Sequence, residues 1–81
     1  MNKFMQLNRI KEILDSKGIS QTWLAKQLNK SFGTVNAWCL NKTQPSLETL
    51  HCISEILSVN IRDLIANNVE SLEVNFDNNG R

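Results

Sequence analysis

Residues 20–38 constrain the fold of this 81-residue chain more tightly than any other stretch. Two segments with helical spacing, QTWLAKQL and FGTVNAWCL, lie only three or four residues apart. Each follows a serine, which favours the first position of a helix, and Asn29 between them tolerates the left-handed backbone conformation. Because so short a link forces the helices to cross closely, the small Ala25 suits the crossing, and Val35 and Trp38 suit a groove on the first helix. The sequence therefore predicts two short helices packed directly against each other.

Three further helical segments flank this pair. Apolar residues recur at helical spacing in residues 7–17 and in residues 47–57. Gly18 ends the first run, while Ser46 and Asn60 stand as N-caps before LETLHCISEIL and IRDLIANN. The predicted fold is thus all-α with five short helices, which must share one core because each is marginal alone. The predicted core consists of Ile10, Ile13, Ile19, Leu24, Ala25, Leu28, Val35, Trp38, Leu50, Ile53, Leu57, Ile61 and Leu64.

The composition excludes several classes of protein. With 41% hydrophobic residues, three Gly and one Pro, the chain is neither collagen-like nor disordered. Two cysteines are too few for a disulfide scaffold. The N-terminal segment lacks the apolar centre of a signal peptide, and no apolar run approaches the roughly 18 residues of a membrane span. We therefore expect a single soluble domain in the cytoplasm that does not associate with membranes.

Candidate catalytic and metal-binding chemistry is sparse. His51 and Cys52 are adjacent, so on a helix they point about 100° apart. Either could pair with Cys39 in a redox or metal site, but two or three such residues without ligand spacing are usually core residues. No glycine-rich phosphate loop is present, and one histidine without a partner pattern does not support catalysis. We expect no enzymatic activity, no cofactor and no bound metal.

Charge is divided unevenly along the chain. Residues 1–45 carry seven basic and two acidic side chains, whereas residues 46–81 carry two basic and six acidic ones. A basic half favours a polyanionic partner, with the acidic half facing away from it. The alternative is chance, because small domains often show such asymmetry.

The stretch SQTWLAKQLNKSFGTVNAW, followed by NKTQPSLETLHCISEILSVNIRDLI, resembles the lambda-repressor-like (Cro/XRE-type) DNA-binding domain. The resemblance covers about residues 7–66 and implies a helix-turn-helix that binds the major groove of double-stranded DNA as a homodimer. It implies a DNA-binding domain at residues 1–68, a tail at 69–81 and a bacterial or phage transcriptional repressor associated with the nucleoid. The alternatives are an antitoxin, a restriction-modification controller, or a protein-interaction module that kept the fold without binding DNA.

Within this resemblance, residues 32–40 match the recognition helix, and Gln21 matches a residue that typically bonds a phosphate. Asn36 can bond adenine with both ends of its amide, or it is an ordinary solvated residue. Phe32 either touches a thymine methyl or tucks under the preceding helix. The flanking lysines suit phosphates or are ordinary surface residues. The candidate DNA-binding residues are Gln21, Lys30, Ser31, Phe32, Gly33, Thr34, Asn36, Ala37, Asn41, Lys42, Thr43 and Gln44.

The chain departs from the family pattern at three places. Asn29 and Asn41 replace two glycines, and Asn is the next best residue for a positive φ. Gly33 inside the recognition helix costs about 1 kcal/mol relative to alanine. Leu14 and Cys39 occupy the positions of a frequent Arg–Glu pair, so we expect an apolar contact between them.

The last segment offers a dimerisation surface. Leu72, Val74 and Phe76 alternate with polar residues, which is the period of a half-buried strand. A lone strand needs a partner edge, from a second tail or from residues 4–7; the alternative is a frayed end. Ile65 points away from its helix's apolar stripe, so the fifth helix is the other candidate interface.

Overall fold

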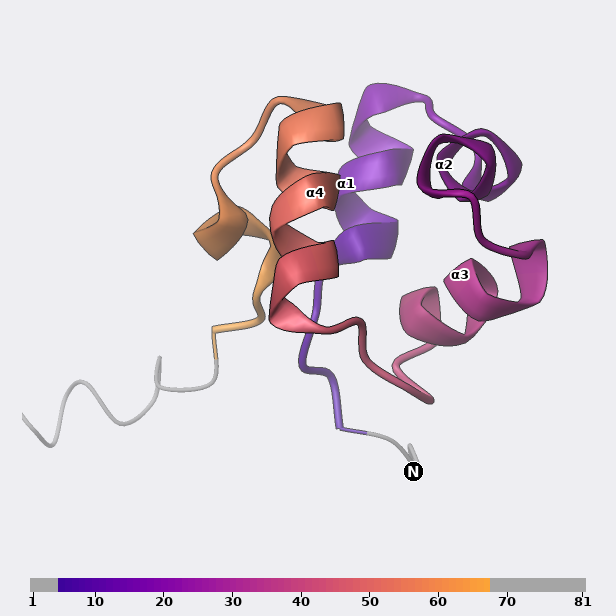
Figure 1. Ribbon diagram of the computed structural model, residues 1–81. Coiled ribbons are helices and arrows are strands. Elements are labelled where there is room, and N and C mark those ends of the chain that lie inside the picture. Colours follow the sequence, from indigo (N-terminus) through magenta and orange to yellow (C-terminus); the bar gives the residue numbers. More distant parts are fainter. Residues whose placement is uncertain (1–4, 68–81) are drawn as a thin grey trace, which may run out of the picture.

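The computed structural model describes residues 5–67 and contains four α-helices followed by one 3₁₀ turn. The elements are α1 (Ile10–Lys17), α2 (Gln21–Leu28), α3 (Phe32–Cys39), α4 (Leu47–Leu57) and η1 (Ile61–Leu64). Helix α2 packs against α3 and α4, α1 packs against α3, and η1 packs against α4. In Figure 1, α3 and η1 (orange) lie on opposite sides of the molecule. The predicted all-α class is confirmed, but the predicted fifth α-helix is not.

Three of the four α-helices begin at a serine whose side chain caps the first turn. The Oγ atom of each serine accepts a hydrogen bond from the backbone N–H three residues later. The pairs are Ser20 with Trp23 at 3.0 Å, Ser31 with Thr34 at 3.1 Å, and Ser46 with Thr49 at 3.1 Å. Each of these serines was predicted as an N-cap from its sequence position alone. A serine before an apolar helical run is therefore enough to locate these three helix starts.

All four α-helices end in the same backbone arrangement. A residue with positive φ follows the helix, and its N–H and the next N–H bond carbonyls of the last turn, which is the Schellman motif. The positive-φ residues are Gly18 (φ 68°), Asn29 (φ 57°), Asn41 (φ 60°) and Ser58 (φ 58°). The first three were predicted. Ser58 was not, because serine carries no strong preference for this conformation.

Helix α1 begins later than predicted, at Ile10 rather than Leu7. The side chain of Asn8 is only 3% exposed, and its Oδ1 accepts a hydrogen bond from the Ile10 N–H at 2.9 Å. The Asn8 side chain thus accepts a hydrogen bond from a backbone N–H in the first turn of α1, in the manner of a helix cap. The helix begins after this residue and does not extend back to Leu7. Leu7 consequently lies outside the core and is 47% exposed.

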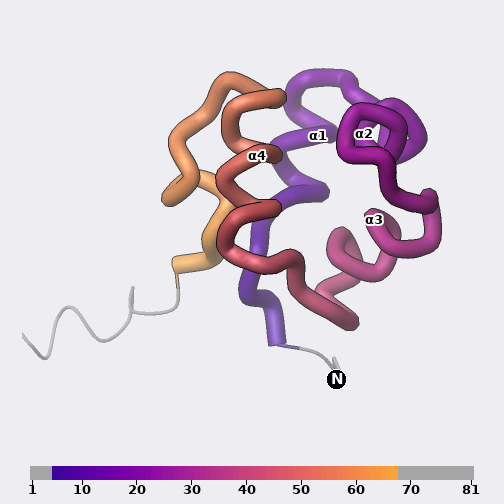
Figure 2. Tube along the Cα trace, in the orientation of Figure 1, coloured from indigo at the N-terminus to yellow at the C-terminus, as the bar shows by residue number. Residues whose placement is uncertain are grey.

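The predicted fifth helix is replaced by η1 and an extended segment. The Asn60 side chain makes no cap hydrogen bond, and Ile65 has an extended backbone that faces Asn8 in an isolated antiparallel bridge. Residues 64–66 bond the segment before α1, whose course beside them is visible in Figure 2. Because this pairing uses backbone groups that a continued helix would need, the helical turn stops at Leu64.

One cluster of buried side chains holds the helices together. Its members are Ile10, Leu14, Leu24, Ala25, Val35, Trp38, Cys39, Leu50, Ile53, Leu57 and Leu64. Four predicted core residues, Ile13, Ile19, Leu28 and Ile61, are only partly buried at its edge. Leu14 and Cys39 both belong to the cluster, and their direct contact stays a prediction. Burial raises the pKa of the Cys39 thiol to about 11, so this cysteine is protonated near neutral pH.

The predicted tail strand of Leu72, Val74 and Phe76 lies outside the described residues, as does Phe4, the first residue of its candidate partner segment 4–7. Within residues 5–67, no helix has the length and apolar character needed to cross a membrane.

Candidate nucleic-acid interface

The corner between α2 and α3 fixes the orientation of α3. Ala25 is 4% exposed, and its carbonyl accepts a hydrogen bond from the Lys30 N–H at 2.9 Å. Val35, on the inner side of α3, is completely buried. With its inner side held in this way, α3 presents its other side to solvent along residues 32–37 (Figure 1).

Two predicted site residues from different helices meet on this outer side. Asn36 Nδ2 donates a hydrogen bond to Gln21 Oε1 at 2.9 Å, and both side chains are partly exposed. The bond uses one of the two Asn36 Nδ2 hydrogens; the other hydrogen and Oδ1 have no partner among residues 5–67. One acceptor and one donor of Asn36 thus stay available for a bidentate partner, and the Nε2 group of Gln21 stays available for an anion.

The first turn of α3 carries small and exposed residues. Phe32 is 52% exposed, which disagrees with the alternative that it tucks under α2. A Cβ atom on Gly33 would meet only Ser31 Oγ, at 3.8 Å, which is an ordinary contact. The Ser31 hydroxyl also lies 3.0 Å from the Thr34 hydroxyl. Ala37, the remaining predicted residue on this side, is partly exposed.

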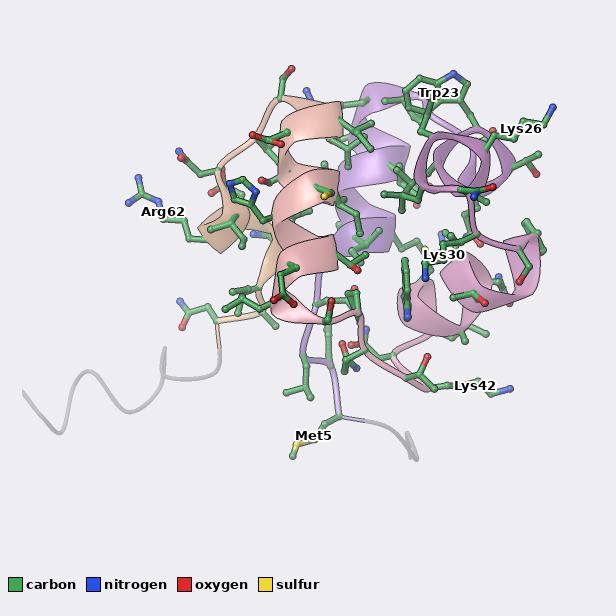
Figure 3. The ribbon with its side chains drawn as sticks, in the orientation of Figure 1. Met5, Trp23, Lys26, Lys30, Lys42 and Arg62 are labelled. Carbon is green, nitrogen blue, oxygen red and sulfur yellow. The ribbon has the colours of Figure 1, made fainter. Side chains whose placement is uncertain are left out.

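Positive charge flanks α3 at both ends. Lys30 precedes the helix and Lys42 follows it, and both are exposed; in Figure 3, Lys42 extends away from the loop after α3, while Lys30 lies between α2 and α3 in this view. Thr43, beside Lys42, is exposed as well. Arg62 extends from the opposite side. The two lysines thus place a positive charge before and after α3, and their predicted phosphate contacts stay a prediction.

Two predicted site residues have a different role. The Oδ1 atom of Asn41 accepts hydrogen bonds from the backbone N–H groups of Leu7 and Asn8, at 2.8 and 2.9 Å. Gln44 Oε1 accepts from Asn8 Nδ2 at 2.8 Å, and Gln44 Nε2 donates to Asn41 Oδ1 at 3.1 Å. These amides hold the N-terminal segment, and their predicted DNA contacts stay a prediction.

Sequence reasoning missed Asn8, the buried polar residue at the centre of this network. Its Nδ2 atom also donates to the Trp38 carbonyl at 2.9 Å, so one side chain bonds both the end of α3 and the start of α1. The available signal was an asparagine two residues before an apolar helical run, a position that favours capping.

The remaining candidate residues do not assemble into a second site. Cys39 is buried and Cys52 is exposed, and no group of three potential metal ligands occurs among residues 5–67. Trp23 is 43% exposed and borders a shallow hollow together with Gly18 and Ile19. Trp23 therefore lies toward the turn between α1 and α2 rather than toward α3.

Comparison with known proteins places this corner in context. Residues 10–64 match the family HTH_3, described as helix-turn-helix. The chain is 33% identical over 63 residues to the HTH-type transcriptional activator BcrR of Enterococcus faecalis, covering 76% of this chain and 31% of that protein. It thus spans about a third of that relative's length. A solved structure titled a "putative DNA-binding protein" from Bacteroides fragilis is 48% identical, with a TM-score of 0.74, over 76% of this chain and all of the other.

The geometry of Gly33 leads to a stability prediction. Replacing Gly33 with alanine should raise the free energy of unfolding by about 0.5 kcal/mol, because the new Cβ has room and alanine is the better helix former. The matched variant Gly18→Ala should lower it by about 1–2 kcal/mol, because Gly18 has a φ of 68° despite the open space around it. Urea denaturation of both variants measures this, and a destabilised Gly33→Ala protein would contradict it.

Proposed function

Since the chain belongs to the helix-turn-helix family HTH_3, we propose that it binds double-stranded DNA and regulates transcription. The observation that carries this proposal is the outer side of α3, where the Gln21–Asn36 bond presents an amide between two exposed lysines. The printed names of the two relatives, a transcriptional activator and a DNA-binding protein, support the same class of function. The protein acts by occupying its site in the cytoplasm, without a chemical step.

Helix α3 enters the major groove with its first turns toward the base edges. Asn36 Oδ1 accepts from the N6 group of an adenine, and the second Nδ2 hydrogen donates to its N7. The Gln21 bond fixes the amide plane of Asn36 before DNA arrives, which lowers the entropy lost on binding. In this proposal the exposed Phe32 and the partly exposed Ala37 contact thymine methyl groups, and Gly33 lets the helix approach closely.

Phosphate contacts set the register. Lys30 and Lys42 supply charge on either side of α3, and Thr43 supplies a hydroxyl. Gln21 Nε2 donates to a phosphate while its Oε1 holds Asn36. The hydroxyls of Ser31 and Thr34 are 3.0 Å apart at the start of α3. In this proposal they face the sugar-phosphate backbone of the same DNA strand as Gln21.

We further infer that the protein is a repressor that binds as a two-fold dimer on half-sites about 34 Å apart. One domain of this size offers a small DNA contact, so a second copy is needed for tight specific binding. The surface for it lies away from α3. Ile65, which follows η1, is 44% exposed, and the alternating tail comes after it in the sequence.

The first prediction concerns non-specific affinity. Lys30→Ala and Lys42→Ala should each weaken binding to every duplex and reduce the log–log slope of affinity against salt by about 0.9, because each removes one phosphate contact. Arg62→Ala is the matched control, since it removes an exposed cation on the opposite side, and its slope should equal that of the wild type. Fluorescence anisotropy across a salt series measures the slopes. Binding without salt dependence would favour the protein-interaction module.

The second prediction concerns specificity. Asn36→Ala should cost about 1–3 kcal/mol at the selected site and relax one base position, with little change on random duplex, because it removes a base contact and no charge. The matched control is Asn60→Ala, which truncates an exposed amide beside η1 whose side chain caps nothing. Selection of bound sequences from a random pool measures both variants. An unchanged consensus for Asn36→Ala means that Asn36 does not read a base.

The third prediction concerns assembly. Deleting residues 69–81 should convert a dimer into a monomer, because the alternating tail supplies the partner edge in this proposal. Sedimentation of both proteins without DNA measures their mass. A dimer that survives the deletion places the interface at η1 and Ile65, whereas a full-length chain that stays monomeric at high concentration contradicts a preformed dimer.

A further inference from the structure

The loop that follows α3 is fastened to the N-terminal segment by one side chain. Asn41 Oδ1 accepts from the N–H groups of Leu7 and Asn8, at 2.8 and 2.9 Å, and Asn41 Nδ2 donates to the Asn8 carbonyl at 3.2 Å. These three bonds join residues 33 or 34 positions apart in the sequence. The side chain of Asn41 therefore holds a separate segment of the chain, in addition to its bond with Gln44 in its own loop.

The segment held by Asn41 is also held on its other edge. The Arg9 N–H donates to the Leu64 carbonyl at 2.8 Å, and the Ala66 N–H donates to the Leu7 carbonyl at 2.9 Å. Residues 7–9 thus lie between the loop after α3 and the segment after η1, with hydrogen bonds to both. Since Asn8 is buried and also bonds the Trp38 carbonyl, this segment is an anchored part of the domain.

Backbone bonds alone do not fix where this loop goes. The Asn41 N–H bonds the Trp38 carbonyl and the Lys42 N–H bonds the Ala37 carbonyl, both at 2.9 Å, which ends α3 as the other helices end. A glycine at position 41 would form both bonds equally well, because φ is 60° there. The asparagine amide adds a fixed attachment to a second segment of the chain, and only residues 42–46 separate it from α4.

We propose that Asn41 is a positioning residue for DNA binding: by fastening the loop to residues 7–8, it holds Lys42 and Thr43 where they contact a phosphate. This inference rests on the proposed function. It assigns Asn41 no contact with DNA, because its amide oxygen already accepts three hydrogen bonds within the protein. The phosphate contact of Lys42 then depends on a side chain that does not touch the phosphate.

The chain offers a matched pair of variants, Asn41→Gly and Asn29→Gly. Both asparagines have positive φ, 60° and 57°, and both end a helix through the same pair of backbone bonds. Among residues 5–67, the exposed Asn29 side chain has no hydrogen-bond partner. Glycine preserves the turn in each case, so the difference between the two variants isolates the side-chain bonds of Asn41.

The experiment measures amide hydrogen exchange and binding to a fixed duplex over a salt series, at a temperature where circular dichroism shows both variants folded. Asn41→Gly should speed exchange at the Leu7 and Asn8 amides about tenfold. It should also weaken DNA binding about tenfold and reduce the salt slope by about one, because a phosphate contact is lost. Asn29→Gly should match the wild type in all three. A loss of stability alone would not change the salt slope of the folded protein.

Two results overturn the inference, and they are distinguishable. If the wild type binds DNA and Asn41→Gly matches Asn29→Gly in affinity and slope, Asn41 does not position the loop, while the proposed function stands. If the wild type binds no duplex at low salt, the proposed function fails and the positioning role fails with it.

Discussion

The close crossing of α2 and α3 is the contact on which the rest of the structure depends. Ala25, the small residue predicted for this crossing, is 4% exposed in the shared core, and its carbonyl bonds the N–H of Lys30 in the link. A larger side chain at position 25 would force the two helices apart, because a packed core accepts extra volume poorly. Helix α3 brings Trp38 and Cys39 into the shared core, so a shift at the crossing would also disturb α1. The orientation of the outer side of α3 follows from the same contact.

The sequence predicted the features that arise from local chemistry. Serine N-caps and positive-φ residues act within one turn of the chain, so Ser20, Ser31, Asn29 and Asn41 could be assigned from their neighbours alone. The inner side of α3 also followed from helical periodicity. The same reasoning identified Asn36 as an outward amide, and the structure adds the bond to Gln21, which depends on the angle between two helices.

The features that the sequence did not predict depend on contacts between distant segments. Asn8 pairs with Ile65, 57 positions later, and η1 ends after one turn where this pairing begins. No local pattern contains that information, because apolar spacing continues through both segments. The bonds of Asn41 and Gln44 to Asn8 could not be predicted for the same reason: their polar loop shows which residues can bond, but not that Asn8 lies beside them.

The central claim is that the outer side of α3 is the surface that meets DNA. The most direct measurement is a titration of ¹⁵N-labelled protein with a duplex selected from a random pool, followed by amide chemical shifts. The account predicts that the largest changes fall on residues 30–37 and 42–43, with little change along the exposed side of α4 at His51 and Cys52 or at Arg62 in η1. Changes centred on α4 and η1, with α3 unaffected, would contradict it.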